Sequence, residues 1–166
     1  AAGTPPVRFT ETGEAAGIAQ FGFGGNTHTL GPTWIDFDGD DFPDLFLPNG
    51  TGFPKRLLRN RGDGTFEDVA SSRGVAAPGG GTGALLFDMD NDGDQDLMVC
   101  HVEGPGLKLY ENTGAAFRDV SASSGVARQA FAYSAVAGDV DGDGLLDVYV
   151  ACYNAFGRVA PSSWTA

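Results

Sequence analysis

Histidine, cysteine and catalytic motifs are what this 166-residue chain has least of: it contains two cysteines and two histidines. Two cysteines are too few for a disulfide framework, and they cannot build a zinc site from two CxxC pairs. No G-x-S-x-G, no HExxH and no Cys/His dyad with a plausible third member occurs, so we predict that the protein is not an enzyme. No apolar run approaches the roughly 20 residues of a membrane span, so we expect no membrane insertion.

Positive charge is also scarce. Lysine and arginine number 10 against 22 acidic residues, which gives a net charge of −12. Such a chain should repel nucleic acid and anionic membrane surfaces, so neither is expected as a partner. The acidic residues are concentrated, because residues 36–44, 88–96 and 139–147 hold five, five and four of the 22. Carboxylates packed this densely repel one another unless a cation neutralises them.

The three acidic segments belong to an internal repeat. They begin at Asp36, Asp88 and Asp139, so their separations are 52 and 51 residues. A second landmark keeps step with them: a phenylalanine followed eight residues later by Gly-Val or Gly-Ile, at Phe9/Gly17, Phe66/Gly74 and Phe117/Gly125. A third is an asparagine before a glycine-containing turn, at Asn60 and Asn112. Three landmarks in register establish the repeat.

Each repeat unit is expected to contain four short strands. Within the first unit we predict them at 33–35, 45–47, 57–60 and 65–69, and within the second at 84–87, 97–100, 107–110 and 117–120. The 26 glycines argue against long helices. Four strands in a unit of about 50 residues is typical of a β-propeller blade. We therefore predict an all-β fold of four-stranded antiparallel blades.

The expected domain organisation is a single repeat domain. It comprises the last strand of a preceding blade at 7–19, blade 1 at 33–76, blade 2 at 84–127 and an incomplete blade 3 at 134–163.

The acidic segments follow the pattern D-x-D-x-D-[G/D]-x-x-D. Carboxylates at positions 1, 3, 5 and 9, with the backbone carbonyl at position 7, can surround one hard cation. Oxygen ligands in this number favour calcium over zinc or copper, so we predict three calcium ions per chain. The predicted ligands are Asp36, Asp38, Asp40, Phe42 and Asp44; Asp88, Asp90, Asp92, Asp94 and Asp96; and Asp139, Asp141, Asp143, Leu145 and Asp147.

Two other calcium motifs are excluded. An EF-hand needs a glutamate at loop position 12, where this chain has Leu47, Val99 and Val150. A spacing of 51 residues rejects the nine-residue RTX repeat.

These loops, the apolar strand after each, and the segment Asn60-Arg-Gly-Asp-Gly-Thr-Phe66 resemble the FG-GAP/VCBS repeats of integrin-α-type β-propellers. They are especially similar to the bacterial propellers found with ASPIC/UnbV domains. The resemblance covers residues 7–152 and implies calcium-binding hairpin loops between the first two strands of each blade, on an extracellular adhesion or recognition propeller. The family favours glycine where the first loop has Asp41, so we expect a weaker first site.

We therefore predict a secreted or cell-surface, calcium-stabilised protein with a structural or adhesive role, and with glycans or a cell-surface protein as possible partners. The chain begins at Ala1 with no methionine and no basic and apolar leader, which is expected of a processed secreted protein and equally of a trimmed chain. One alternative is a carbohydrate-binding propeller module; the other is a fragment of a polysaccharide lyase or hydrolase of the same architecture.

The expected strands form incomplete blades at both ends of the chain. Val7–Thr12 matches only the last strand of a blade, whereas residues 134–163 supply inner strands without an outer one. We expect other copies of the chain as partners, with Val7–Thr12 of one chain completing the third blade of the next in a head-to-tail ring or filament. A fragment of a longer propeller is the alternative.

The two cysteines are expected to be buried free thiols that form neither a zinc site nor a catalytic pair. Cys100 and Cys152 follow the last aspartate of their loops by four and five residues. Strict alternation along a strand would point them to opposite faces. A disulfide between them is the alternative.

Overall fold

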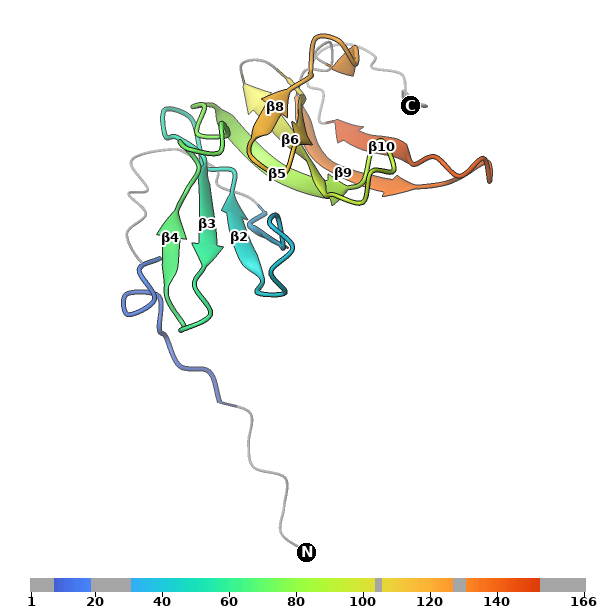
Figure 1. Cartoon of the computed structure of the whole chain (residues 1–166). Helices are drawn as coiled ribbons and strands as arrows, with labels where there is room; N and C mark the ends of the chain where they lie inside the picture. Colours follow the sequence, from blue (N-terminus) through green and yellow to red (C-terminus); the bar gives the residue numbers. More distant parts are fainter. Residues whose placement is uncertain (1–7, 19–30, 104–105, 127–130, 153–166) are drawn as a thin grey trace, which may run out of the picture.

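A computed structural model describes residues 8–18, 31–103, 106–126 and 131–152, and these residues form three antiparallel sheets and no α-helix (Figure 1). The predicted all-β fold of four-stranded antiparallel blades is thereby confirmed for the first two units. Nothing in the described part of the chain has the length and apolar character of a helix that could cross a membrane.

Ten strands make up the three sheets. The first sheet has the order β1-β2-β3-β4, with bounds Thr33–Ile35, Asp44–Leu47, Arg56–Asn60 and Phe66–Asp68. The second has the order β5-β6-β7-β8, with bounds Gly80–Phe87, Asp96–Glu103, Lys108–Asn112 and Phe117–Asp119. The third pairs β9 (Ala132–Gly138) with β10 (Asp147–Cys152). The expected continuation of the third unit to residue 163 lies outside the described residues.

The sheets stack face to face, and apolar side chains fill the two joints between them. The first joint contains Phe46 and Leu57 from the first sheet and Leu97 and Val99 from the second. The second joint contains Met98 and Cys100 from the second sheet and Val148 and Val150 from the third. Successive residues of β6 therefore face opposite neighbours, as the two-residue period of a strand requires.

Each sheet has a forward face, defined as the side toward the next sheet along the chain, and a backward face on the other side. Met98 and Cys100 lie on the forward face of the second sheet, and Leu97 and Val99 lie on its backward face. Burial of both faces explains why the middle strand β6 is apolar without alternation.

Strand β5 begins four residues earlier than the sequence predicts, because two of its glycines sit where neighbours approach closely. A Cβ on Gly81 would lie 2.3 Å from the Pro48 carbonyl oxygen of the first sheet. A Cβ on Gly83 would lie 2.8 Å from the Tyr133 carbonyl oxygen of the third. The glycine run is thus a strand that both neighbouring sheets contact.

Of the segment Val7–Thr12, expected as the last strand of a preceding blade, residues 8–12 are described and are in no strand, and residues 13–17 make a turn. A strand needs a hydrogen-bonded neighbour, and no described strand lies beside this segment. The Gly-Ile pair after it nevertheless occupies its repeat position. Phe66 N donates to the Ala16 carbonyl at 3.0 Å, as Phe117 N donates to the Arg73 carbonyl at 2.9 Å before Gly74.

The two cysteines are free thiols, as expected, and they lie in the same joint. Cys100 lies on the forward face of the second sheet and Cys152 packs on the backward face of the third, so both belong to the second joint. Alternation does place them on opposite faces of their own sheets, but stacking brings those faces together. Both are free thiols, and burial, followed by the proximity of Cys152, raises the pKa of Cys100 to about 12.

Candidate metal centres

Each acidic loop connects the first two strands of its sheet, at 36–43, 88–95 and 139–146. All three loops take left-handed backbone conformations at positions 4 and 6. The φ angles there are 69° and 67° at Gly39 and Asp41, 59° and 93° at Asn91 and Gly93, and 79° and 89° at Gly142 and Gly144. Asp41 and Asn91 adopt this region more readily than most non-glycine residues. The three loops therefore share one backbone design.

The aspartate at position 1 shapes each loop through its own backbone. Asp36 Oδ1 and Oδ2 each accept a backbone N–H, from Asp40 and Asp41, at 3.1 Å. In the second loop Asp88 accepts N–H groups from the equivalent residues Asp92 and Gly93 at 3.1 and 3.0 Å. Asp139 of the third loop also accepts two, from Gly142 and Gly144. These bonds curl the chain so that the loop's other carboxylates converge.

The aspartate at position 9 closes the loop against the sheet. Asp96 Oδ2 accepts the Met89 N–H at 2.8 Å, and its Oδ1 accepts the Asn112 N–H at 2.8 Å. Asp44 repeats this arrangement, accepting the Asn60 N–H through Oδ1 at 2.7 Å and the Phe37 N–H through Oδ2 at 3.3 Å. Each buried carboxylate thus joins its loop to the third strand of its sheet.

Three carboxylates come together in each loop, with one oxygen from each lying within 4.8 Å of the others. The clusters are Asp36, Asp38 and Asp40; Asp88, Asp90 and Asp96; and Asp139, Asp141 and Asp147. The clusters do not include every predicted ligand. Asp92 and Asp143 instead accept the N–H of position 7 through Oδ1, at 2.9 and 2.8 Å. All fifteen predicted ligands, inside the clusters or outside them, stay predictions.

Electrostatics within the loops disfavours the charged form of some carboxylates. Burial raises the pKa of Asp44 to about 6, against the lowering effect of its two backbone hydrogen bonds, and Asp38 and Asp40 raise it further. Burial and the nearby Asp92 raise the pKa of Asp90, and burial raises that of Asp96. A bound cation would reverse this preference, because positive charge stabilises ionised carboxylates.

The first and second loops differ in the charge beside them. Arg59 on β3 pairs with Asp38 at 2.7 Å and with Asp40 at 3.2 Å. The equivalent residue on β7 is Glu111, which pairs with Arg118 and adds to the negative charge that raises the pKa of Asp90. The positive side chain of Arg59 therefore lies beside the first loop, and the negative side chain of Glu111 lies beside the second.

The donor set fits a hard divalent cation. Every clustered ligand atom is a carboxylate oxygen, the donor type that calcium and magnesium prefer. In the first loop, Asp38 Oδ1 is buried and has no hydrogen-bond partner among the described residues. A buried, unpaired carboxylate oxygen is costly, and a cation in the loop would give it a partner.

The sequence located the loops but missed the residues that support them. Asn112 donates through Nδ2 to the Phe37 carbonyl of the neighbouring sheet at 3.0 Å and to the Gln95 carbonyl at 3.3 Å. Asn60 Nδ2 likewise donates to the Pro43 carbonyl at 3.0 Å. The recurrence of asparagine was visible as a repeat landmark, but its link to the loops needs the third dimension. The sequence pattern did not indicate that Arg59 pairs with the first loop.

The chain is similar to a known repeat family and to known proteins. A family model described as "FG-GAP-like repeat" matches residues 54–99 and 88–150. Cartilage acidic protein 1 of Homo sapiens is 32% identical over 138 residues, covering 81% of this chain and 20% of that protein. Cartilage acidic protein 1 of Xenopus tropicalis is 36% identical over 110 residues, covering 64% of this chain and 17% of that protein. The chain spans about a fifth of the length of these relatives.

The family model covers more than half of the chain, and its matches span the second and third acidic loops, with the sheets that carry them. The resemblance inferred from the loop pattern is therefore confirmed, and this chain belongs to the FG-GAP-like repeat family.

Proposed function

We propose that the protein is a calcium-stabilised, propeller-type structural or adhesion protein that works outside the cell and carries out no catalysis. The observation that supports this most is the threefold recurrence of one loop geometry, with three converging carboxylates each time. Asp36, Asp88 and Asp139 would hold the loop shape, while Asp38, Asp90 and Asp141 would give their oxygens to the ion. The ion's role is to neutralise the repelling charges and fix each hairpin.

An extracellular setting suits sites of this kind. Calcium sites of extracellular modules bind with dissociation constants of about 10⁻⁴–10⁻³ M, which only calcium-rich surroundings would fill. The relatives carry the name cartilage acidic protein, and this chain shares the acidity with its net charge of −12. Glycans or a cell-surface protein are proposed as further partners.

We also propose that copies of the chain associate head to tail by strand addition. Only two strands of the third sheet, β9 and β10, lie within the described residues. Strand β4 is followed in the sequence by Arg73, whose carbonyl accepts a hydrogen bond from Phe117 N. Residues 8–12 are followed in the same way by Ala16, whose carbonyl accepts a hydrogen bond from Phe66 N. By this correspondence they would supply the outermost strand of a preceding blade. The third blade of another copy would supply the other strands of that blade.

Calcium stoichiometry tests the metal assignment. Isothermal titration of the calcium-free chain is expected to give three ions per chain. Asp90→Ala and Asp141→Ala should each remove one ion and leave the other two, because the three loops lie in separate hairpins. Arg56→Gln, remote from the loops and paired with Asp68, is the control. Binding of no ion, or loss of all three with one substitution, would contradict the assignment.

The first loop should be the weakest of the three, because Arg59 occupies two of its carboxylates and repels an incoming cation. Arg59→Gln is expected to strengthen calcium binding at that loop on the order of threefold to tenfold, a moderate change because the guanidinium is largely exposed. The measurement is a titration in an Asp90→Ala, Asp141→Ala background, where the first loop is the remaining site.

Arg56→Gln in the same background is the matched control, since it removes the same charge from the same strand but from a pair with Asp68. Its affinity should stay near that of the background. If Arg59→Gln weakens binding instead, Arg59 organises the loop rather than opposing the ion.

A further inference from the structure

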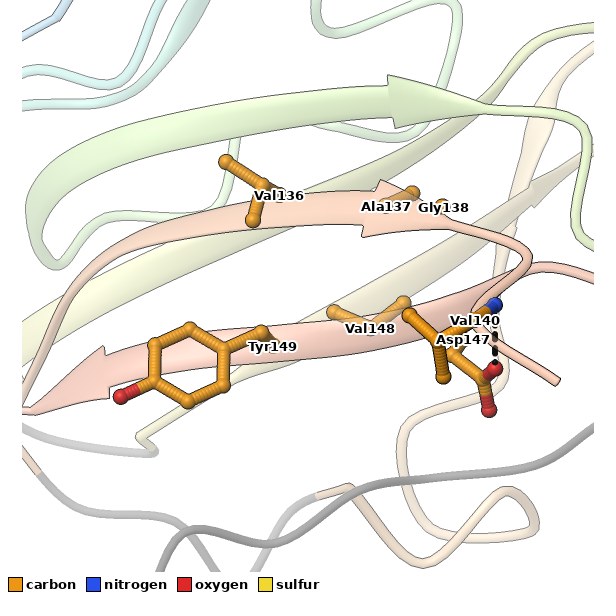
Figure 2. A pocket seen from close by; sticks show the side chains of 7 residues that line it. All are labelled: Val136, Ala137, Gly138, Val140, Asp147, Val148 and Tyr149. Carbon is orange, nitrogen blue, oxygen red and sulfur yellow. Dashed lines mark hydrogen bonds between the residues drawn. The ribbon is translucent and has the colours of Figure 1, made fainter.

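One hydrogen bond recurs inside every acidic loop, from the backbone N–H of the residue at position 2 to the carboxylate of the aspartate at position 9. The pairs are Phe37 and Asp44 at 3.3 Å, Met89 and Asp96 at 2.8 Å, and Val140 and Asp147 at 3.1 Å. Figure 2 shows the third pair beside β9 and β10, with its bond as a dashed line. The residue at position 2 therefore orients the carboxylate that closes each loop.

The surroundings of the residue at position 2 differ between the loops. Phe37 of the first loop is 3% exposed and lies in the joint between the first and second sheets. Its ring lies 6.3 Å from that of Phe117 on β8, and the guanidinium of Arg73 lies over it at 4.9 Å from the ring centroid. Val140 of the third loop is instead 81% exposed. Contacts with the second sheet therefore fix the first loop at Phe37.

Asn112 of the second sheet joins the first two loops by hydrogen bonds. Its side-chain Nδ2 donates to the Phe37 carbonyl of the first loop at 3.0 Å, in a buried position. Its backbone N–H donates to Asp96 Oδ1 of the second loop at 2.8 Å. A continuous series of hydrogen bonds therefore runs from Asp44 to Asp96, and both ends of the series are predicted ligands at position 9.

Asn60 of the first sheet occupies the repeat position of Asn112 and shows which bonds a loop needs for itself. Both asparagines donate their N–H to the position-9 aspartate, donate Nδ2 to the carbonyl at position 8, and accept the N–H of the residue two positions later. Among the described residues, Asn60 bonds to no neighbouring sheet. The bond from Asn112 to Phe37 is therefore additional to the support of its own loop.

We propose that Asn112 couples calcium binding in the first and second loops, so that binding in either loop strengthens binding in the other. The inference rests on the metal sites proposed above. Once the charge of Asp96 is balanced, Asp96 keeps the Asn112 backbone in place, and the Asn112 side chain holds the Phe37 carbonyl. The Phe37 N–H is then aimed at Asp44 before the first loop is filled. Ordering that one loop has undergone need not be repeated for the other, and linkage makes the effect equal in both directions.

Electrostatics opposes this coupling. Filling one loop removes negative charge that attracts a second cation to the other loop. Salt screens exposed charges that lie further apart than the Debye length, which is about 8 Å at 0.15 M ionic strength, so the measurement is made there. The opposing effect is common to chains that differ only at Asn112. It therefore cancels when those chains are compared.

The test is isothermal titration with calcium of full-length chains whose third loop is disabled by Asp141→Ala. Adding Asp90→Ala leaves the first loop as the binding site, and adding Asp38→Ala instead leaves the second. The association constant for filling both loops, divided by the product of the two single-loop constants, is the coupling factor. Asn112→Ala, introduced into all three chains, should lower this factor about fivefold.

Asn60→Ala is the matched control, because it removes the equivalent bonds within a unit and leaves the bond between the sheets. It should leave the coupling factor unchanged, whatever it does to the single-loop constants. Equal coupling factors in the wild type and in Asn112→Ala overturn the proposal and leave the metal sites intact. So does a fall of the same size in Asn60→Ala. Single-loop chains that bind no calcium overturn the metal sites, and the coupling with them.

Hydrogen exchange keeps the proposal testable if Asn112→Ala does not fold. The probe is the Phe37 amide in the chain that keeps only the second loop as a binding site and retains Asn112. Calcium should slow the exchange of this amide about fivefold, because linkage gives the first loop the same stabilisation that it gives the second. The Thr65 amide, in the turn between β3 and β4, should exchange at an unchanged rate. An unchanged rate at Phe37, with calcium bound to the second loop, overturns the coupling.

Discussion

Excess EDTA is expected to lower the melting temperature of the calcium-saturated chain by about 8–16 °C. At ten times its dissociation constant, each ion contributes about 1.4 kcal/mol, so three ions contribute about 4 kcal/mol. That is a large part of the roughly 5–15 kcal/mol by which domains are stable. Removal of the ions also returns the loop carboxylates to mutual repulsion. Thermal unfolding followed by circular dichroism measures the change.

A variant that lacks the carboxylate at position 3 of each loop provides the control. Asp38→Asn, Asp90→Asn and Asp141→Asn combined should make the melting curve insensitive to EDTA. No backbone N–H donates to Asp38 among the bonds described, and Asp90 and Asp141 each accept one, which the side-chain oxygen of asparagine can still accept, so the loop shape should survive. In EDTA this variant should melt near the wild-type temperature, because the relief of repulsion is offset at the first loop by loss of the exposed Arg59–Asp38 ion pair. A wild-type melting curve that EDTA leaves unchanged would contradict calcium-dependent stability.

The strands and loops could be predicted because each depends on neighbours in sequence. Leu45 to Leu47 and Leu97 to Cys100 follow acidic loops directly, and β2 and β6 are observed there. The spacing of Asp88 and Asp90 likewise fixes their convergence, because the turn between them is local. Recurrence of the pattern made the loop assignment specific, which a single loop would not.

What could not be predicted depends on contacts between repeats. The meeting of Cys100 and Cys152 follows from stacking of two sheets, which no local alternation encodes. The pairing of Arg59 with the first loop joins residues 19 to 21 positions apart, through the register of β3 with β2. The segment 8–12 read as a strand because its pattern matches one, but a strand requires partners that the described residues do not place beside it.

A buried pair of basic groups lies far from the acidic loops. Lys55, just before β3, and His101, near the end of β6, are 2% and 0% exposed. Lys55 Nζ donates to the Ala77 carbonyl at 2.7 Å. His101 Nδ1 lies 2.7 Å from the Gly106 carbonyl oxygen, so it carries the proton, and buried Nε2 has no partner among the described residues. This geometry favours a neutral imidazole.

Acid should therefore destabilise the fold through His101. Burial lowers the pKa of His101 to about 4, and the nearby Lys55 and Lys108 lower it further. In the unfolded chain histidine binds its proton near pH 6.5. The contribution of neutral His101 to the free energy of unfolding is therefore complete above that pH and is lost as the pH falls to about 4. The shift corresponds to about 3 kcal/mol of unfolding free energy.

The measurement compares urea unfolding of the wild type and His101→Gln between pH 7.5 and pH 4. Wild type should lose about 3 kcal/mol more than the variant over this range, because glutamine has no proton to bind. The loop carboxylates titrate in both proteins, so their effect cancels in the difference. Lys55→Met should reduce the difference but keep most of it, since burial is the larger cause of the shift. Parallel stability curves for wild type and His101→Gln would mean that His101 has the same pKa in the folded and the unfolded chain, which would contradict the prediction.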